Sequence, residues 1–239
     1  LPLAARLVTA SNPELALSVS GLTRTYGSHV VVDRLELQVE AGDIYGFLGP
    51  NGAGKTTTMR MILGLIRRDA GTVRIFGNDD SVSARARLGG IVEHPRFYPY
   101  LSGAENLRVF AAYSGGCSDS KMQELLELVR LRDRQDDPVR TYSLGMRQRL
   151  GVAQALLNDP SLLMLDEPMN GLDPAGMKEL RELIDRLQRE IGLTVFVSSH
   201  ILKEIEGLCT RVGIIQDGRK VAEGRSEELL EDGESMEDC

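Results

Sequence analysis

Apolar and polar residues follow two different patterns along this chain. Residues 44–48, 162–165 and 195–197 are short, almost continuously apolar runs, which predicts parallel strands buried on both faces. Residues 15–19 and 29–39 alternate between apolar and polar, which predicts antiparallel strands with one face exposed to solvent. Because buried strands alternate with helical patterns, we expect an α/β fold built on a mostly parallel sheet.

Helical patterns fill residues 95–158 without a strand-like stretch between them. Ser102 and Glu105 form a capping box, and Ser143 is another good N-cap residue, so helices should begin directly after both serines. We therefore expect a helical block at 95–158, inserted into a sheet domain that covers residues 14–225.

Composition and charge narrow the functional classes. The chain has 239 residues, 42% of them hydrophobic, and a net charge of −7, which is ordinary for a globular protein. The acidic tail at 226–239 accounts for this net charge, so the preceding residues sum to about zero. A neutral body lacks the basic field of a nucleic-acid binder, so we expect no nucleic-acid partner. The tail is most simply a solvated end, with binding of a partner as the alternative.

Other sequence features argue against a membrane span and against secretion. No apolar run approaches the roughly 18 residues that a span requires, and residues 1–13 resemble a loose leader rather than a signal peptide. The three cysteines, Cys117, Cys209 and Cys239, show no metal-binding spacing. Their odd number and sparseness fit a reducing cytosol.

A glycine-rich stretch lies between the predicted strand at 44–48 and the next helical pattern. It reads Gly49, Pro50, Asn51, Gly52, Ala53, Gly54, Lys55, Thr56 and Thr57. In the order strand, loop and helix, the pattern G-x-x-x-x-G-K-[ST] binds phosphate, because backbone N–H groups and the helix N-terminus point at the anion. Lys55 would place a positive charge on the β- and γ-phosphates, and the Thr56 hydroxyl is a hard ligand for Mg²⁺. The alternative is an ordinary glycine turn, which would not need a buried strand before it and a helix after it.

Polar residues directly follow two of the buried apolar runs. Asp166 and Glu167 end one run, and His200 comes shortly after another. Ligands of open α/β sheets bind at the carboxyl ends of the strands. Asp166 could hold Mg²⁺ opposite Thr56, and Glu167 could align or deprotonate an attacking water. The alternatives are a capped helix start for the acidic pair and a structural role for His200, which we instead expect near a γ-phosphate.

The order of these motifs resembles the ATP-binding cassette ATPases over roughly residues 14–225. The motifs that carry the resemblance, after the phosphate loop and the helical block, are Ser143-Leu144-Gly145-Met146, Leu165-Asp166-Glu167-Pro168, Gly171-Leu172-Asp173 and His200. The resemblance implies a P-loop NTPase (RecA-like) core with a mostly parallel sheet, an antiparallel β subdomain and an inserted α-helical subdomain. It also implies an ATPase that uses ATP and Mg²⁺ and works as a head-to-tail dimer.

The resemblance further implies a role for each site residue. On the chain's own nucleotide, Tyr26 would stack on adenine, Lys55 and the loop amides would hold phosphates, Thr56, Asp166 and Glu93 would hold Mg²⁺, Glu167 would be the general base, and His200 would contact the γ-phosphate. Across the dimer, Ser143 and Gly145 would reach the partner's ATP, and Asp173 would lie at the seam. Three alternatives stay open: Tyr26 as a surface aromatic, and Ser143 and Asp173 as helix caps only.

Two departures from the family pattern bear on function. The common signature Leu-Ser-Gly-Gly-Gln is replaced by Tyr142-Ser143-Leu144-Gly145-Met146, and Glu93 stands where the family usually has glutamine. Since Ser143 and Gly145 are kept, we expect γ-phosphate sensing to be kept. Glu93 adds a negative charge beside the phosphates, which should slow turnover without the transporter partner. In both departures the sequence resembles the subgroup that serves bacterial bacitracin and lantibiotic self-resistance exporters.

The resemblance therefore implies an ATPase subunit of an exporter of peptide antibiotics or drugs. It would sit on the cytoplasmic face of the cell membrane, bound to an integral membrane permease. Phe97, Tyr98 and Tyr100 follow Glu93 closely and would receive a cytoplasmic helix of that permease, although packing into the core is the alternative. A soluble ATP-sensing module is an alternative function. A DNA-repair ATPase of the same family fits less well, because this chain has no sustained heptads.

Overall fold

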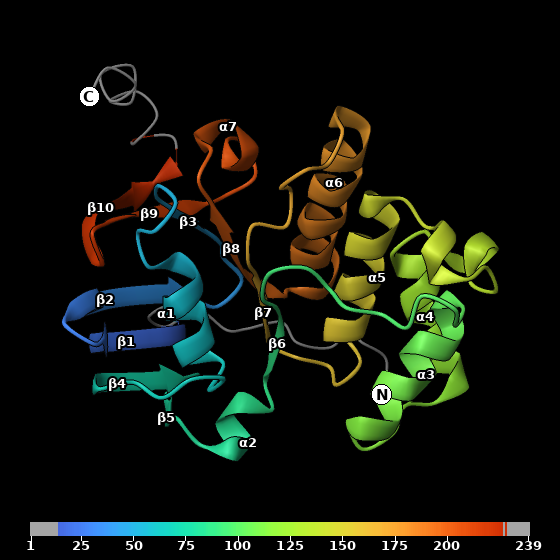
Figure 1. Cartoon of the computed structure of the whole chain (residues 1–239), viewed down its shortest axis with the longest axis horizontal. Helices are drawn as coiled ribbons and strands as arrows, with labels where there is room; N and C mark the ends of the chain where they lie inside the picture. The colour runs from blue at the N-terminus through green and yellow to red at the C-terminus, as the bar shows by residue number, and fades with distance from the viewer. Residues whose placement is uncertain (1–13, 227, 229–239) are drawn as a thin grey trace.

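Two sheets and a group of helices make up the fold in the computed structural model, which describes residues 14–226 and 228 (Figure 1). The predicted leader at 1–13 and most of the predicted tail at 226–239 lie outside the described residues. The strands are β1 (Leu15–Tyr26), β2 (His29–Glu40), β3 (Ile44–Leu48), β4 (Ala70–Ile75), β5 (Asn78–Asp79), β6 (Leu88–Ile91), β7 (Leu162–Leu165), β8 (Thr194–Ser199), β9 (Arg211–Gln216) and β10 (Arg219–Arg225). The helices are α1 (Lys55–Ile62), α2 (Val82–Arg85), α3 (Gly103–Tyr113), α4 (Asp119–Leu128), α5 (Leu144–Ala155), α6 (Pro174–Ile191) and α7 (Leu202–Ile205), with two 3₁₀ turns at Arg132–Arg134 and Val139–Thr141.

The larger sheet has six strands in the order β10-β9-β3-β8-β7-β6. Its neighbours are parallel from β9 to β6, and only the β9–β10 hairpin is antiparallel. The predicted parallel sheet is therefore confirmed. The order places β8 between β3 and β7 although it follows both in the sequence. As a result, the carboxyl ends of these three strands lie next to one another.

The continuous apolar runs are buried because both faces of this sheet are covered. Leu163 and Leu165 pack into a core with α3, α4, α5 and α6, whereas Met164, between them, packs into a second core with α1 and the smaller sheet. In β8, Val195 and Phe196 divide between the two cores in the same way. Successive side chains of a strand point to opposite faces, so a strand covered on both sides must be apolar at every position.

The smaller sheet is antiparallel, in the order β2-β1-β4-β5. The alternation in 15–19 and 29–39 predicted its first two strands, but β1 continues to Tyr26. The pairing shifts register between Val19 and Leu22, where Gly21 has φ +62°. A glycine in this left-handed region forms a bulge, after which the strand resumes.

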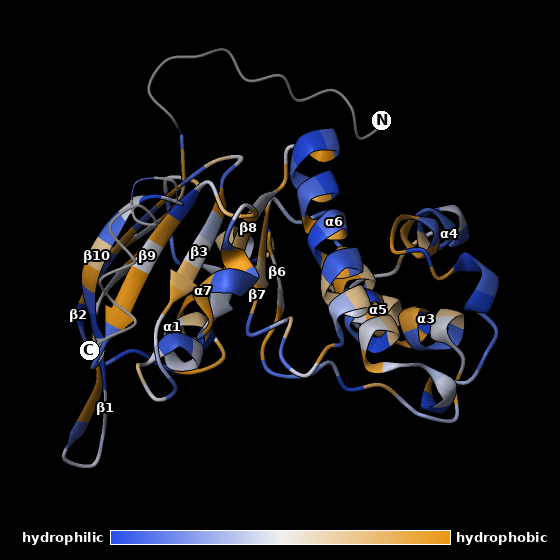
Figure 2. Ribbon diagram, turned by 90° about the horizontal axis from the view of Figure 1, so that it is seen from above, coloured by the Kyte–Doolittle hydropathy of each residue, from blue (hydrophilic) through white to orange (hydrophobic). Residues whose placement is uncertain are grey.

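Between β6 and β7 the chain forms helices and turns, as the pattern over 95–158 predicted, together with one isolated bridge between Ser102 and Pro138. Ser102 and Glu105 form both bonds of the capping box at the start of α3, and Ser143 caps α5. Figure 2 shows α3, α4 and α5 grouped on the far side of α6 from α1. Within the described part of the chain, no helix is both long enough and apolar enough to span a bilayer.

Candidate functional site

The glycine-rich loop joins the end of β3 to the start of α1, as predicted. Gly49 is buried, and a Cβ there would lie 2.2 Å from the Ile215 carbonyl oxygen, so no other residue fits. Gly54 is the N-cap of α1, with φ +102°. These two positions allow the loop to turn tightly into the helix, which leaves the first N–H groups of α1 without helical partners. Such groups form an anion-binding site.

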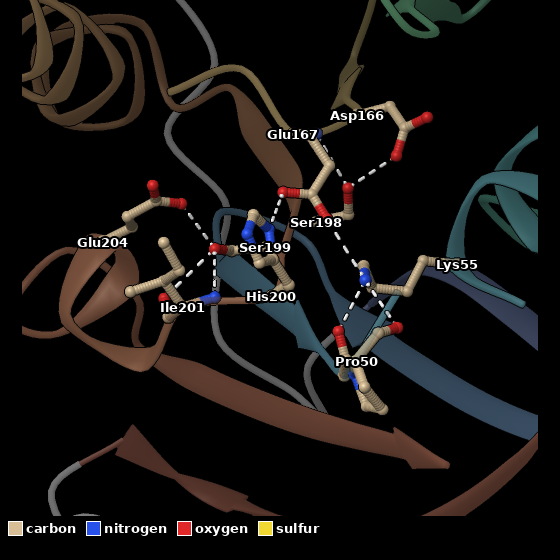
Figure 3. A network of polar contacts seen from close by, with 10 residues as sticks. Pro50, Lys55, Asp166, Glu167, Ser198, Ser199, His200, Ile201 and Glu204 are labelled. Atoms are coloured by element: carbon tan, nitrogen blue, oxygen red, sulfur yellow. Dashed lines mark hydrogen bonds and ion pairs between the residues drawn. The ribbon is translucent and has the colours of Figure 1, made fainter. Parts of the chain in front are cut away.

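Lys55 is the first residue of α1, and its side chain is 5% exposed. Its ammonium nitrogen donates to the carbonyl oxygens of Gly49 at 2.5 Å and Pro50 at 3.1 Å. It also lies 3.1 Å from Glu167 Oε1 (Figure 3). An ammonium group has three N–H donors, and these three oxygens match them. Lys55 is thus held between the phosphate loop and the end of β7.

Asp166 and Glu167 follow β7 at the predicted edge of the sheet. Asp166 is 2% exposed, and its Oδ1 accepts a hydrogen bond from the Ser198 hydroxyl at 2.7 Å. The Glu167 N–H donates to the same hydroxyl at 2.8 Å. Ser198, in β8, therefore fixes both acidic residues. Ser198 was not among the residues predicted for the site, although it lies near the end of a buried strand, two residues before His200.

Glu167 lies between the two groups predicted to act with it. Its Oε2 is 2.7 Å from His200 Nδ1, and its Oε1 faces Lys55. Protonated at Nδ1, the His200 ring donates this bond and is oriented by it. The backbone of Glu167 has φ +48°, an uncommon conformation for a non-glycine residue that often marks a functional site. Figure 3 shows Lys55, Glu167 and His200 converging from three different elements.

The oxygen ligands near this cluster fit Mg²⁺. Thr56, in the first turn of α1, offers a hydroxyl, and Asp166 offers a carboxylate. Mg²⁺ prefers such hard oxygens and usually needs only one or two from the protein, since phosphates and waters supply the others. Within the described ranges, no group of three or more His, Cys, Asp or Glu residues could hold a metal ion.

Glu93 follows β6 and forms an ion pair with a residue of α1. It is 56% exposed, and its Oε1 is 2.5 Å from Arg60 Nη2. Arg60 is one helical turn after Thr56, so the two lie on one face of α1. The ion pair offsets the charge that glutamate adds, although so exposed a pair contributes little stability. Contact between Glu93 and Mg²⁺ stays a prediction.

Ser143 and Gly145 lie at the start of α5, which packs against the start of α6 near Asp173. Ser143 is exposed and caps α5 by accepting from the Met146 N–H at 3.2 Å, while Asp173 caps α6 by accepting from the Gly176 N–H at 3.1 Å. Figures 1 and 2 both place α5 and α1 on opposite sides of β7. One chain therefore does not bring Ser143 and Gly145 to its own phosphate loop.

The start of α5 is held rigidly by the residue before Ser143. Tyr142 is buried, and this burial raises the pKa of its phenol. The phenol therefore stays protonated at neutral pH and donates to the Arg134 carbonyl oxygen at 2.6 Å. The Tyr142 carbonyl accepts a hydrogen bond from Arg147. These contacts hold the backbone next to Ser143 in place, while Ser143 itself is exposed to solvent.

Tyr26 is at the last position of β1 and is 46% exposed. The guanidinium of Arg24 lies over its ring, 4.6 Å from the centroid. This placement leaves both predictions for Tyr26 open, stacking on adenine or a surface aromatic.

Comparisons with known proteins agree with this geometry. A family model described as ABC transporter matches residues 32–170. The bacitracin transport ATP-binding protein BcrA of Bacillus licheniformis is 50% identical over 210 residues, which cover 87% of this chain and 69% of BcrA. The lantibiotic transport ATP-binding protein SrtF of Streptococcus pyogenes is 40% identical over 207 residues, covering 87% and 90% of the two chains.

Solved structures show the same fold. CbiO1 of Clostridium perfringens, part of an ABC transporter complex, superposes with a TM-score of 0.84 at 22% identity over 94% of each chain. A dimeric ATP-binding cassette in a post-hydrolysis state with ADP and Pi superposes with a TM-score of 0.77 at 23% identity, covering 88% of this chain and 98% of the other. The family match covers more than half of the chain, and its relatives carry names of the subgroup that the sequence resembles. The chain therefore belongs to the ABC transporter family and is one of its ATP-binding ATPase subunits.

Proposed function

We propose that this subunit powers export of a peptide antibiotic through a membrane permease, by closing and reopening a head-to-tail pair of ATPase subunits. The observation that carries the proposal is the position of Glu167, which contacts both Lys55 and His200 beside the phosphate loop. The relatives named for bacitracin and lantibiotic transport support this class of cargo.

In the proposed reaction, water attacks the γ-phosphorus of ATP while the bond from that phosphorus to the β–γ bridging oxygen breaks. Glu167 accepts one proton from the water, and the products are ADP and inorganic phosphate. The phosphates carry more charge than one carboxylate, so Lys55 would exchange Glu167 Oε1 for phosphate oxygens. That exchange frees Glu167 to accept the proton, while its contact with His200 keeps it oriented.

Mg²⁺ would be held by Thr56 and Asp166, and it would neutralise charge on the β- and γ-phosphates. Ser198 supports this role because its hydroxyl holds Asp166 at 2.7 Å. Fixing the carboxylate in advance lowers the entropy lost when it binds a ligand.

The second subunit would complete each site. Ser143 is exposed at the N-terminus of α5, a 12-residue helix, and such a terminus suits a phosphate. Because it lies apart from the chain's own Lys55, it would serve the ATP of another copy. Gly145 lies beside Gly176, with 3.6 Å between its ideal Cβ position and the Gly176 Cα, so α5 and α6 pack closely at this point.

Phosphate release and co-purification test the proposal against the ATP-sensing module and the repair ATPase that the sequence left as alternatives. Purified protein should release phosphate from ATP with Mg²⁺, and it should co-purify with a multi-span membrane protein encoded beside it. ATP binding without phosphate release, with or without that membrane protein, would favour the sensing module. Co-purification with DNA instead would favour a repair ATPase.

The aromatic loop after Glu93 gives a prediction about coupling. Phe97 is partly buried, stands edge-on to Phe110 with centroids 6.0 Å apart, and packs against the core. Tyr98 and Tyr100 are exposed and lie 6.1 Å apart, ring to ring, so they could receive a permease helix. We expect Tyr98→Ala with Tyr100→Ala to reduce antibiotic export by roughly tenfold, as loss of an aromatic hot spot does, with ATPase activity kept.

The measurement is export and phosphate release from the same membrane vesicles. Tyr113→Ala is the matched control, because Tyr113 is an exposed tyrosine at the end of α3. If export and ATPase activity fall together in the double variant while its thermal unfolding is unchanged, the coupling role is wrong.

A further inference from the structure

Glu204, in the short helix α7, is a buried acidic residue close to the reaction site. It is 8% exposed, and its Oε2 lies 2.6 Å from the Ser199 hydroxyl oxygen (Figure 3). Burying a carboxyl group costs free energy unless the group is hydrogen-bonded or paired with a charge. Its contact with the residue before His200 indicates what it serves.

The Ser199 hydroxyl has one proton and two acceptors within reach. Glu204 Oε2 is at 2.6 Å and the Ile201 carbonyl oxygen at 3.1 Å, so the proton goes to Glu204. The hydroxyl oxygen then accepts the Ile201 N–H at 3.0 Å. This bond spans His200, and it fixes the turn of the backbone on which the His200 ring is carried.

The same turn is attached to the phosphate site at two further points. The Ser199 carbonyl oxygen accepts the Gly49 N–H at 3.2 Å, which joins the turn to the start of the phosphate loop. His200 Nδ1 contacts Glu167 at 2.7 Å. A rotation of the Ser199 hydroxyl would therefore change the position of His200 relative to Glu167.

Arg181, on α6, holds the helix that carries Glu204. Its guanidinium donates to the carbonyl oxygens of Glu204 and Glu206, both at 2.5 Å. These are carbonyls at the C-terminal end of α7, where a cation is favourable. Arg181 thus ties the helix that carries Glu204 to α6, whose N-cap is Asp173.

We infer that Glu204 is a positioning residue for ATP hydrolysis, acting through the Ser199 hydroxyl to hold His200 against Glu167. This inference rests on the proposed function, in which the contact with His200 keeps Glu167 oriented. Glu204 itself contacts Ser199, not Glu167 or Lys55, so it orients the site without joining the chemistry.

The test compares Glu204→Ala with Glu204→Gln in the full chain. Alanine removes the carboxylate that accepts the Ser199 hydroxyl proton. The hydroxyl can then donate to the Ile201 carbonyl oxygen instead. We expect kcat for ATP to fall roughly 10- to 100-fold, as a small misplacement of a reacting group does, with KM little changed. Glutamine keeps an oxygen at the same place, so Glu204→Gln should restore most of the activity.

Two further variants separate positioning from folding. Glu206→Ala removes an exposed carboxylate next to α7 and should leave kcat unchanged. In a His200→Ala background, Glu204→Ala should cause no additional loss, because residues that act as one unit are not additive. The histidine NMR signal that disappears in His200→Ala should shift in Glu204→Ala and stay in place in Glu206→Ala.

Each other outcome overturns a distinct statement. If His200→Ala keeps full activity, the proposed role of His200 is wrong. If His200→Ala is inactive but Glu204→Ala has normal kcat and an unshifted His200 signal, the positioning role is wrong. Equal losses in Glu204→Ala and Glu204→Gln, or a further loss in the His200→Ala background, would make Glu204 a residue of the fold instead.

Discussion

Glu167→Gln should lower the rate of ATP hydrolysis by roughly a hundredfold to ten-thousandfold, the usual contribution of a general base, while ATP still binds. The amide has the size of the carboxylate and keeps one oxygen for Lys55 or His200, which lie at 3.1 and 2.7 Å. It cannot accept a proton from water. Phosphate release and nucleotide affinity, measured on the same preparation, check both parts of the prediction.

Glu206→Gln is the matched control, since it makes the same change at an exposed position outside the cluster. A Glu167→Gln variant that hydrolyses ATP at the original rate would exclude Glu167 as the base. A variant that loses ATP binding as well would mean that the carboxylate serves the fold of the phosphate loop.

The same variant tests the head-to-tail pair. With hydrolysis blocked and Mg²⁺ and ATP saturating, closed dimers should accumulate, because the step that reopens them is missing. Light scattering or analytical ultracentrifugation would detect them. If the variant stays monomeric both alone and with its permease, the proposed closing and opening of two subunits is wrong.

Lys55→Met should weaken ATP binding on the order of a hundredfold, as loss of a hydrogen-bonded charge does, and should leave no measurable turnover. Methionine fills a similar space but cannot donate to the Gly49 and Pro50 carbonyl oxygens or to phosphate. It also leaves Glu167 without its Lys55 partner. Thermal unfolding with and without Mg²⁺ and ATP is the measurement, because ligand binding raises the unfolding temperature.

Lys178→Met, at an exposed position of α6, is the control and should keep the full ATP-dependent rise. A Lys55→Met variant that keeps this rise would remove Lys55 from the phosphate site. One that unfolds at a much lower temperature even without ATP would show that Lys55 mainly holds the loop and β7 together.

Much of the fold was predictable because its signals are local. The caps at Ser102, Ser143 and Asp173 are where the sequence predicted them, since capping depends on residues within one turn. Side-chain partners were less predictable. Glu93 pairs with Arg60, and this contact depends on how α1 lies beside the end of β6.

The aromatic loop shows the same limit at the level of single residues. The sequence allowed either a core role or a binding role for its three rings. The structure divides them: Phe97 packs against Phe110, and Tyr98 and Tyr100 are exposed. Neighbouring residues in an irregular loop have no fixed period, so sequence alone could not assign their directions.

The sequence by itself determined the phosphate loop, the buried strands, the helical block and the acidic pair after β7, because each depends on the order of neighbouring residues. Only the tertiary structure decided that β8 lies between β3 and β7, which brings Lys55, Glu167 and His200 together. It also decided that the Ser198 hydroxyl bonds Asp166 and that Glu204 bonds the Ser199 hydroxyl next to His200. The physical reason is that strand order and side-chain direction follow from packing between distant segments, which no local pattern records.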